Sequence, residues 1–190
     1  MFINILPTYA QVNQNDIKIL FNEILESERK EIIYTDKVKD WSRNQMIEVI
    51  KTGKLVAWNK KDSIVLTAKE QKYLLKKIKD EKTFIWPDSL FVNSKRIELD
   101  SMLPYLKSAN WLYYTTINKL KIQGDTVLHK KLESPCVFAF TKPIYFRNET
   151  LCIFHMIRMF AHSSGYSDSY LYKKIDNEWV RSIVFTSGVW

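Results

Sequence analysis

The sequence predicts a single α+β domain over residues 13–190, with N-terminal helices, a small hairpin and a C-terminal antiparallel β-meander. Up to residue 80, apolar residues recur with the period of a helix, whereas strand–turn–strand patterns follow Pro135. Helices first and strands last are typical of α+β domains. The chain has 190 residues, 46% of them hydrophobic and only 4 of them glycine, which suits one packed core.

Residues 1–12 stand apart from this domain. The run from Met1 to Ala10 is apolar and ends in a small residue, and the chain turns polar at Gln11. This pattern resembles the second half of a secretory signal peptide, without the basic segment that would precede it. It predicts either a signal-peptide remnant, and so export to the periplasm, cell surface or medium, or an N-terminal arm, which leaves a cytoplasmic protein as the alternative.

Two helices are expected before residue 54. Residues 16–29 carry one apolar stripe at helical spacing, formed by Ile17, Leu20, Phe21 and Ile24. A short strand is expected over 31–34. A second helix begins at Ser42, which has capping-box spacing to Gln45, and Gly53 supplies a left-handed stop.

A small hairpin and a third helix come next. The hairpin is expected over 55–58 and 63–66. The segment from Thr67 to Glu70 has the form of a capping box, in which each side chain bonds the backbone of the other residue. The helix buries Leu74, Leu75 and Ile78, and it ends before Pro87.

Residues 88–134 give the weakest local signals. The segment 111–117 is rich in aromatic and β-branched residues, which favours a strand, and 117–122 fits a strand or a helix equally well. No assignment is made between these alternatives.

Strands follow Pro135. One is expected over 136–140. A hairpin joins 144–147 to 150–157, and a second joins 170–174 to 179–185 around Asp176-Asn177. Strict alternation in the last strand places Trp179, Arg181, Ile183 and Phe185 on one face. The sheet's aromatic residues could form its core or line a ligand pocket; they are Tyr145, Phe146, Phe154, Tyr170, Tyr172, Trp179 and Phe185.

The two cysteines, Cys136 and Cys152, fall in predicted strands. The first hairpin's register places Cys152 opposite Tyr145, so a disulfide to Cys136 requires another strand alongside. Two buried free thiols are expected instead. The spacing matches no zinc motif, and no metal or cofactor is expected.

The one interruption in the strand pattern, Arg158–Asp168, holds the candidate catalytic groups. His155 lies just before it, and His162 lies within it beside Ser163 and Ser164. A histidine base, a hydroxyl and the Asp168 carboxylate could act in hydrolysis, with Arg158 holding an anionic substrate. The same residue types also make ordinary turns.

The chain is basic, with a formal net charge of +8. Residues 67–135 hold 13 basic and 8 acidic side chains, so this part of the chain should attract an anionic partner most strongly. The third helix carries a lysine stripe at i, i+3, i+7 and i+10, made of Lys69, Lys72, Lys76 and Lys79. This stripe could contact phosphates or an anionic membrane, or it could be a solvated helix face.

Several segments together resemble uncharacterised, exported proteins of Bacteroidetes-type bacteria. They are Leu66–Glu70, Lys142–Asn148, Leu151–Phe154, Tyr170–Lys174 and Asn177–Trp179. The resemblance covers about residues 66–185 and implies a helix followed by a C-terminal antiparallel sheet. It implies no activity and no site residues. A cysteine- and glycine-rich loop of that group is here Met159–Gly165, without cysteine.

These observations favour a non-enzymatic secreted or envelope domain that binds another protein or an anionic ligand. One alternative is a small hydrolase or nuclease that uses His155 or His162 as its base. Another is a nucleic-acid or membrane binder that uses the lysine stripe. No segment has the roughly 18 consecutive apolar residues of a membrane-spanning helix.

Overall fold

The computed structural model describes residues 19, 31–38, 40–81, 84–88, 90–124, 134–160 and 164–189. The predicted helix over 16–29 therefore lies outside the described residues, apart from Ile19, which is helical and buried. The predicted signal-peptide remnant or arm over 1–12 also lies outside them. So do His129, His162 and Ser163.

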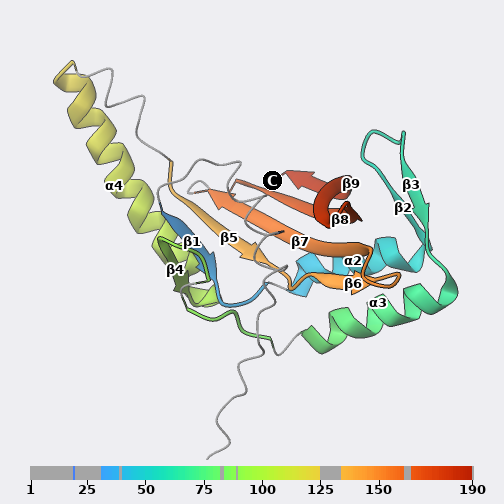
Figure 1. The fold of residues 1–190 in the computed structure, drawn as a ribbon. Helices are drawn as coiled ribbons and strands as arrows, with labels where there is room; N and C mark the ends of the chain where they lie inside the picture. The colour runs from blue at the N-terminus through green and yellow to red at the C-terminus, as the bar shows by residue number, and fades with distance from the viewer. Residues whose placement is uncertain are drawn as a thin grey trace, which may run out of the picture.

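The described strands form a mixed sheet in the order β4-β1-β5-β7-β8-β9, with β6 also paired to β7 (Figure 1). β1 runs parallel to both of its neighbours, and the other pairs are antiparallel. The bounds are β1 Ile32–Thr35, β4 Ser94–Ile97, β5 Cys136–Phe140, β6 Ile144–Phe146, β7 Leu151–Phe160, β8 Gly165–Ile175 and β9 Glu178–Val189.

Besides the helical residue Ile19, the described residues form three helices and a separate hairpin next to this sheet. The helices are α2 Asp40–Lys51, α3 Ala68–Asp80 and α4 Met102–Ile122, and a 3-10 turn, η2 Leu99–Ser101, leads into α4. The hairpin pairs β2 Lys54–Val56 with β3 Ser63–Val65. The fold is therefore α+β, with a helix–hairpin unit before a C-terminal meander, as the sequence predicted.

α2 and α3 cover one face of the sheet, over the odd-numbered residues of β7. Ile50, Leu74 and Ile78 pack there with Ile153 and Leu171. α4 adds a second apolar cluster farther along the strands, where Met102 and Leu106 meet Ile157 and Met159. Burial of these apolar side chains holds the helices to the sheet.

The opposite face carries an aromatic core. The rings in it include Tyr34, Trp86, Phe91, Phe138, Phe140, Phe154, Tyr170, Tyr172 and Trp179. The buried Trp86 indole donates to the carbonyl of Phe140 at 2.8 Å, which ties the 84–91 segment to the end of β5. The sequence allowed the aromatic residues of the predicted sheet either a core role or a place in a ligand pocket, and most of them lie in the core.

The predicted C-terminal strands are present, but β7, β8 and β9 are longer than predicted, and β8 begins at Gly165 rather than at residue 170. β5 spans the expected residues, Cys152 lies opposite Tyr145, and Asp176 and Asn177 adopt the left-handed backbone of a tight hairpin turn. Cys136 and Cys152 are both buried and free.

The predicted faces of the last strand are wrong. The β8–β9 register shifts twice, so that Ser182 and Phe185 are extra residues on β9. Each extra residue reverses the alternation beyond it. Trp179 therefore packs in the aromatic core, whereas Ile183 and Phe185 pack against the helices on the other face.

The strand-like composition of residues 111–117 is also misleading, because α4 is helical throughout Met102–Ile122. The hydroxyls of Thr115 and Thr116 donate to the carbonyls four residues earlier, of Trp111 and Leu112, at 2.8 and 2.9 Å. These side-chain bonds accommodate β-branched residues within the helix.

The start of α3 is fixed by one carboxylate. Thr67 and Glu70 form the predicted capping box, with the Thr67 amide donating to Glu70 at 2.8 Å. The guanidinium of Arg147, in the β6–β7 turn, donates to both oxygens of Glu70 at 2.8 and 3.0 Å. These contacts lower the pKa of the Glu70 carboxyl to about 2, with the Arg147 bond the largest cause.

We predict that Arg147→Gln lowers the free energy of unfolding by about 1 kcal/mol, because Arg147 is 43% exposed and water screens the pair. The pKa of the Glu70 carboxyl should rise toward 4.5 in this variant, as measured by NMR titration. Lys51→Gln is the control, since the Lys51–Glu48 pair is exposed on both sides and should contribute less than about 0.5 kcal/mol. Equal losses in urea unfolding of the two variants would contradict the assigned role of Arg147.

Candidate functional site

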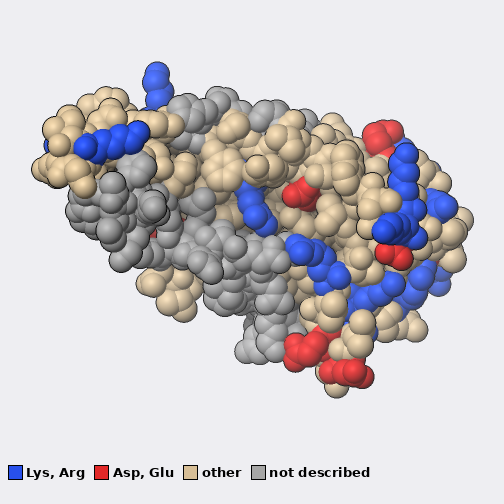
Figure 2. Space-filling model, turned by 90° about the horizontal axis from the view of Figure 1, so that it is seen from above, with Lys and Arg blue, Asp and Glu red and all other residues tan. Residues whose placement is uncertain are grey.

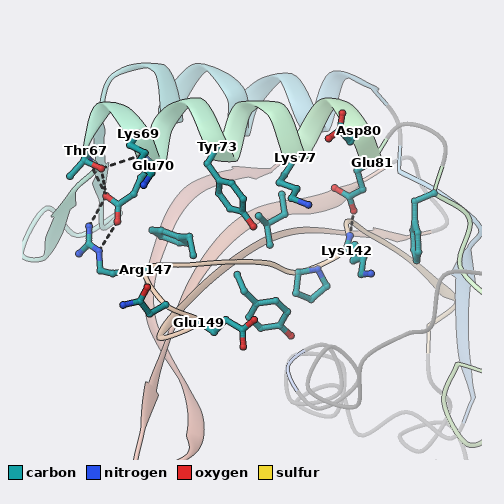
Figure 3. A pocket seen from close by; sticks show the side chains of 16 residues that line it. Thr67, Lys69, Glu70, Tyr73, Lys77, Asp80, Glu81, Lys142, Arg147 and Glu149 are labelled. Carbon is teal, nitrogen blue, oxygen red and sulfur yellow. Dashed lines mark hydrogen bonds and ion pairs between the residues drawn. The ribbon is translucent and has the colours of Figure 1, made fainter.

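A hollow lies between α3 and the β6 strand with its flanking loops (Figure 3). Its volume is about 820 Å³, within the range of small-molecule sites. Eight consecutive residues, 142–149, form one wall, and α3 with the segment after it forms the other. We refer to this hollow as the α3–β6 groove.

One side of α3 faces the groove. Lys69, Tyr73 and Lys77 are spaced at i, i+4 and i+8, which stacks them along one helix face. Figure 3 shows Tyr73 and Lys77 pointing from the helix toward β6. The buried residues Leu74 and Ile78 follow them by one position, so the groove face flanks the buried stripe.

The floor and end of the groove are apolar and aromatic. Ile144 and Phe146 of β6 are buried beneath it, and Pro143 and Phe84 lie at its border. A ligand with a ring or short apolar chain could contact these surfaces while its polar end stays near the rim.

Four basic and four acidic side chains line the groove, and three of the basic ones are lysines. The Lys77 ammonium lies over the Tyr73 ring at 5.8 Å, and that of Lys142 lies over the Phe84 ring at 5.4 Å. Within the described part of the chain, no carboxylate lies at ion-pair distance from Lys69, Lys77 or Lys142. These ammonium groups are available to an anion.

The fourth cation at the groove, Arg147, is engaged differently. It holds Glu70, and its Nη2 also donates to the Val65 carbonyl at 3.2 Å. Glu81 Oε1, at the other end, accepts from the backbone amide of Lys142. The two walls are therefore joined at both ends by carboxylates of the helical side.

The predicted lysine stripe divides between two faces of α3. All four of its lysines, Lys69, Lys72, Lys76 and Lys79, are exposed. Only Lys69 lines the groove; the other three lie on the helix face turned away from the buried stripe.

Residues of β7, β8 and β9 and of the β2–β3 turn line a second hollow, of about 640 Å³. It brings together the predicted pair Arg158 and Asp168 with Trp58, Tyr166 and Arg181. The predicted interruption at Arg158–Asp168 is wrong for most of its length, since Arg158 pairs with Tyr166 and Met159 with Gly165. The Asp168 carboxylate accepts from the hydroxyl of Tyr170 at 3.2 Å. Of the predicted site residues, Arg158 and Asp168 line this hollow, whereas His155 does not.

His155 instead lies on the helix-covered face of the sheet, with no exposed surface. It is three residues from Arg158 along one strand, so the two side chains point to opposite faces. Among the described residues no histidine meets a basic group in a cleft, and the other candidate base, His162, lies outside them.

Hydrogen bonds around His155 run in one consistent direction. Thr186 donates to Ser169 at 2.6 Å, and Ser169 meets Nδ1 of His155 at 2.8 Å. On the other side, Nε2 meets Ser167 at 3.2 Å, and Ser167 donates to Gln45 at 3.2 Å. Each hydroxyl has one proton to give, so these directions assign the imidazole proton to Nε2. A neutral ring completes the chain.

Burial lowers the pKa of His155 to about 4. The folded protein therefore keeps the ring neutral at pH values where the unfolded chain, with a pKa near 6.5, protonates it. A base of this kind is held inside the fold and does not reach a substrate from solution.

Sequence reasoning missed Lys77, Phe84 and Lys142 as site residues. The groove joins segments about 70 positions apart, and no motif marks either one. The spacing of Lys69, Tyr73 and Lys77 was visible, but it does not say which helix face lies beside β6.

The described residues also lack two other kinds of feature. Across the described ranges, no cluster of three His, Cys, Asp or Glu side chains is arranged to hold a metal ion. None of the described helices is long and apolar enough to cross a membrane.

Comparison with known proteins gives no assignment. No protein-family model, no curated protein and no solved structure matches the chain.

We predict that the free energy of unfolding falls by about 2 kcal/mol between pH 7.5 and pH 5 through His155 alone. The sign follows from the lowered pKa. Below pH 6.5 the His155 ring binds a proton in the unfolded state, whereas in the folded state it stays neutral until about pH 4. The unfolded state is therefore stabilised as the pH falls. Urea unfolding at several pH values, for the protein and for His155→Gln, measures the difference.

The variant should lack this part of the pH dependence. Should it unfold too easily to compare, NMR titration of the His155 ring in the unmodified protein gives its pKa directly. A ring pKa near 6.5, or an unchanged pH slope in the variant, contradicts the prediction.

Proposed function

We propose that this protein is a non-enzymatic binding domain whose ligand occupies the α3–β6 groove. The observation that carries the proposal is the set of Lys69, Lys77 and Lys142 around an aromatic and apolar hollow, with no described carboxylate paired to them. Concave sites with apolar walls and a few convergent polar groups are the usual form of ligand sites.

The groove's chemistry favours an anionic ligand with a flat or apolar body. Two of the ammonium groups lie over aromatic rings, so an anionic group can meet them while the ligand's body contacts Tyr73 or Phe84. The rigid connection of Glu70 to Arg147 keeps one end of the groove preformed, which reduces the ordering cost of binding.

The groove's residue types support binding rather than catalysis. Of the described residues that line it, none is His, Cys or Ser, the usual nucleophiles and bases. Glu70 has a pKa near 2 and is engaged by Arg147, which makes it a poor general base. We place the domain outside the cytoplasm, in the envelope or medium, on the basis of the signal-like run from Met1 to Ala10.

We predict that an aromatic sulfonate, naphthalene-2-sulfonate, binds the groove and shifts the NMR signals of Tyr73 and Lys77. The double variant Lys77→Gln/Lys142→Gln should weaken binding about tenfold, since each screened charge contact contributes up to about 1 kcal/mol. Lys76→Gln/Lys79→Gln is the control, because these lysines lie on the same helix outside the groove.

The neutral analogue 2-naphthalenemethanol tests the requirement for charge and should bind more weakly than the sulfonate. Shifts that gather at the Arg158–Asp168 hollow, or an equal loss of affinity in both lysine pairs, would exclude the groove as the site.

A further inference from the structure

The outward side of α4 combines exposed apolar residues with unpaired positive charge. Of the 14 large apolar side chains exposed in the described residues, five belong to this helix, so exposure is concentrated there. They are Leu103, Trp111, Leu112, Tyr114 and Ile122, with Trp111 at 72% and Ile122 at 86% exposed. Exposed apolar side chains gathered in this way are typical of an interaction surface.

The helix projects from the body of the protein (Figure 1). Met102, Leu106 and Ile117 are its buried residues, and they lie on one side. Leu103, Trp111, Tyr114 and Ile122 fall within an arc of about 100° on another side, given 100° per residue. Four of the five exposed residues therefore form a stripe along the helix, and Leu112 lies outside it.

The charge of the helix is of one sign. Residues 102–124 contain Lys107, Lys119 and Lys121 and no Asp or Glu. All three lysines are exposed, and no described carboxylate pairs with them. Figure 2 shows blue side chains among tan atoms at the end of the molecule that α4 occupies.

We propose that this stripe docks on an anionic lipid bilayer, with α4 lying in the plane of the headgroups. Transfer of leucine, isoleucine and tryptophan side chains from water to the boundary between headgroups and acyl chains is favourable in free energy. Tryptophan and tyrosine are enriched at this boundary. Lys107 and Lys121 share the arc of the apolar residues, and their long side chains reach up to the phosphate level. The lysines add attraction to acidic lipids.

Two other occupants fit less well. A second copy of the chain would bring six lysines together without an acidic residue on either helix to pair with them. A nucleic acid would use the lysines and Trp111, but it offers nothing to the aliphatic Leu103, Leu112 and Ile122.

Cosedimentation of the full chain with vesicles tests the proposal. Vesicles of phosphatidylcholine with about one-third phosphatidylserine should bind the protein at least tenfold more tightly than phosphatidylcholine alone. Trp111→Ser/Ile122→Ser should lose at least tenfold in affinity. Its control is Trp58→Ser/Val65→Ser, which removes two exposed apolar side chains from the β2–β3 hairpin, 72% and 68% exposed against 72% and 86%.

The charge is tested separately. Lys107→Gln/Lys119→Gln/Lys121→Gln should weaken binding by tenfold or more. Lys72→Gln/Lys76→Gln/Lys79→Gln, which neutralises as many exposed lysines on α3, should weaken it less. Circular dichroism of each variant checks that it remains folded.

Three results overturn the proposal. The first is an equal loss of vesicle affinity in the α4 variants and their controls. The second is binding to duplex DNA or RNA without binding to vesicles, and the third is a dimer that dissociates on α4 substitution and does not bind vesicles. The vesicle experiment is independent of the α3–β6 groove, so it can fail while the groove binds its anion.

Discussion

The Glu70 carboxylate joins three parts of this structure. It closes the capping box that begins α3, and its two oxygens receive the Arg147 guanidinium from the β6–β7 turn. That turn holds three consecutive residues in left-handed backbone, Arg147, Asn148 and Glu149. Left-handed backbone is energetically unfavourable for residues other than glycine or asparagine.

The contacts of this turn offset its strain. Thr150 donates its amide and its hydroxyl to the carbonyl of Arg147, and the ion pair anchors the turn to the helix. Because the wall at residues 142–149 leads into the same turn, the width of the groove depends on Glu70. A loss of this carboxylate would release the helix start and the turn together.

Local signals predicted the parts of the fold that local chemistry determines. The Thr67–Glu70 box, the Gly53 stop and the Asp176-Asn177 turn each act within a few residues, and each was found where the sequence indicated. β-bulges escape such reasoning, because the extra residue on β9 is defined only by its partner on β8.

α4 and the groove escaped prediction for a different physical reason. α4 buries few residues, so its apolar pattern has little helical period and its aromatic composition misleads. The groove is formed where α3 meets β6, and packing of Leu74 and Ile78 alone decides which lysines face it.

His155 shows how a predicted catalytic candidate can be structural. It lies between the apolar cluster under α2 and α3 and the cluster under α4, where β8 and β9 contribute hydroxyls. The directed chain from Thr186 to Gln45 satisfies each polar group in this seam and favours one arrangement of α2 over the sheet.

The place of β1 in the sheet bears on how the chain acquires its structure. β1 lies between β4 and β5, whose partner residues follow it by about 60 and 100 positions. A ribosome must therefore release most of the chain before both edges of its first described strand are paired. Long-range parallel pairing is slow to form, so the nascent N-terminal half keeps an apolar strand uncovered during synthesis, at the stage when a chaperone has most to bind.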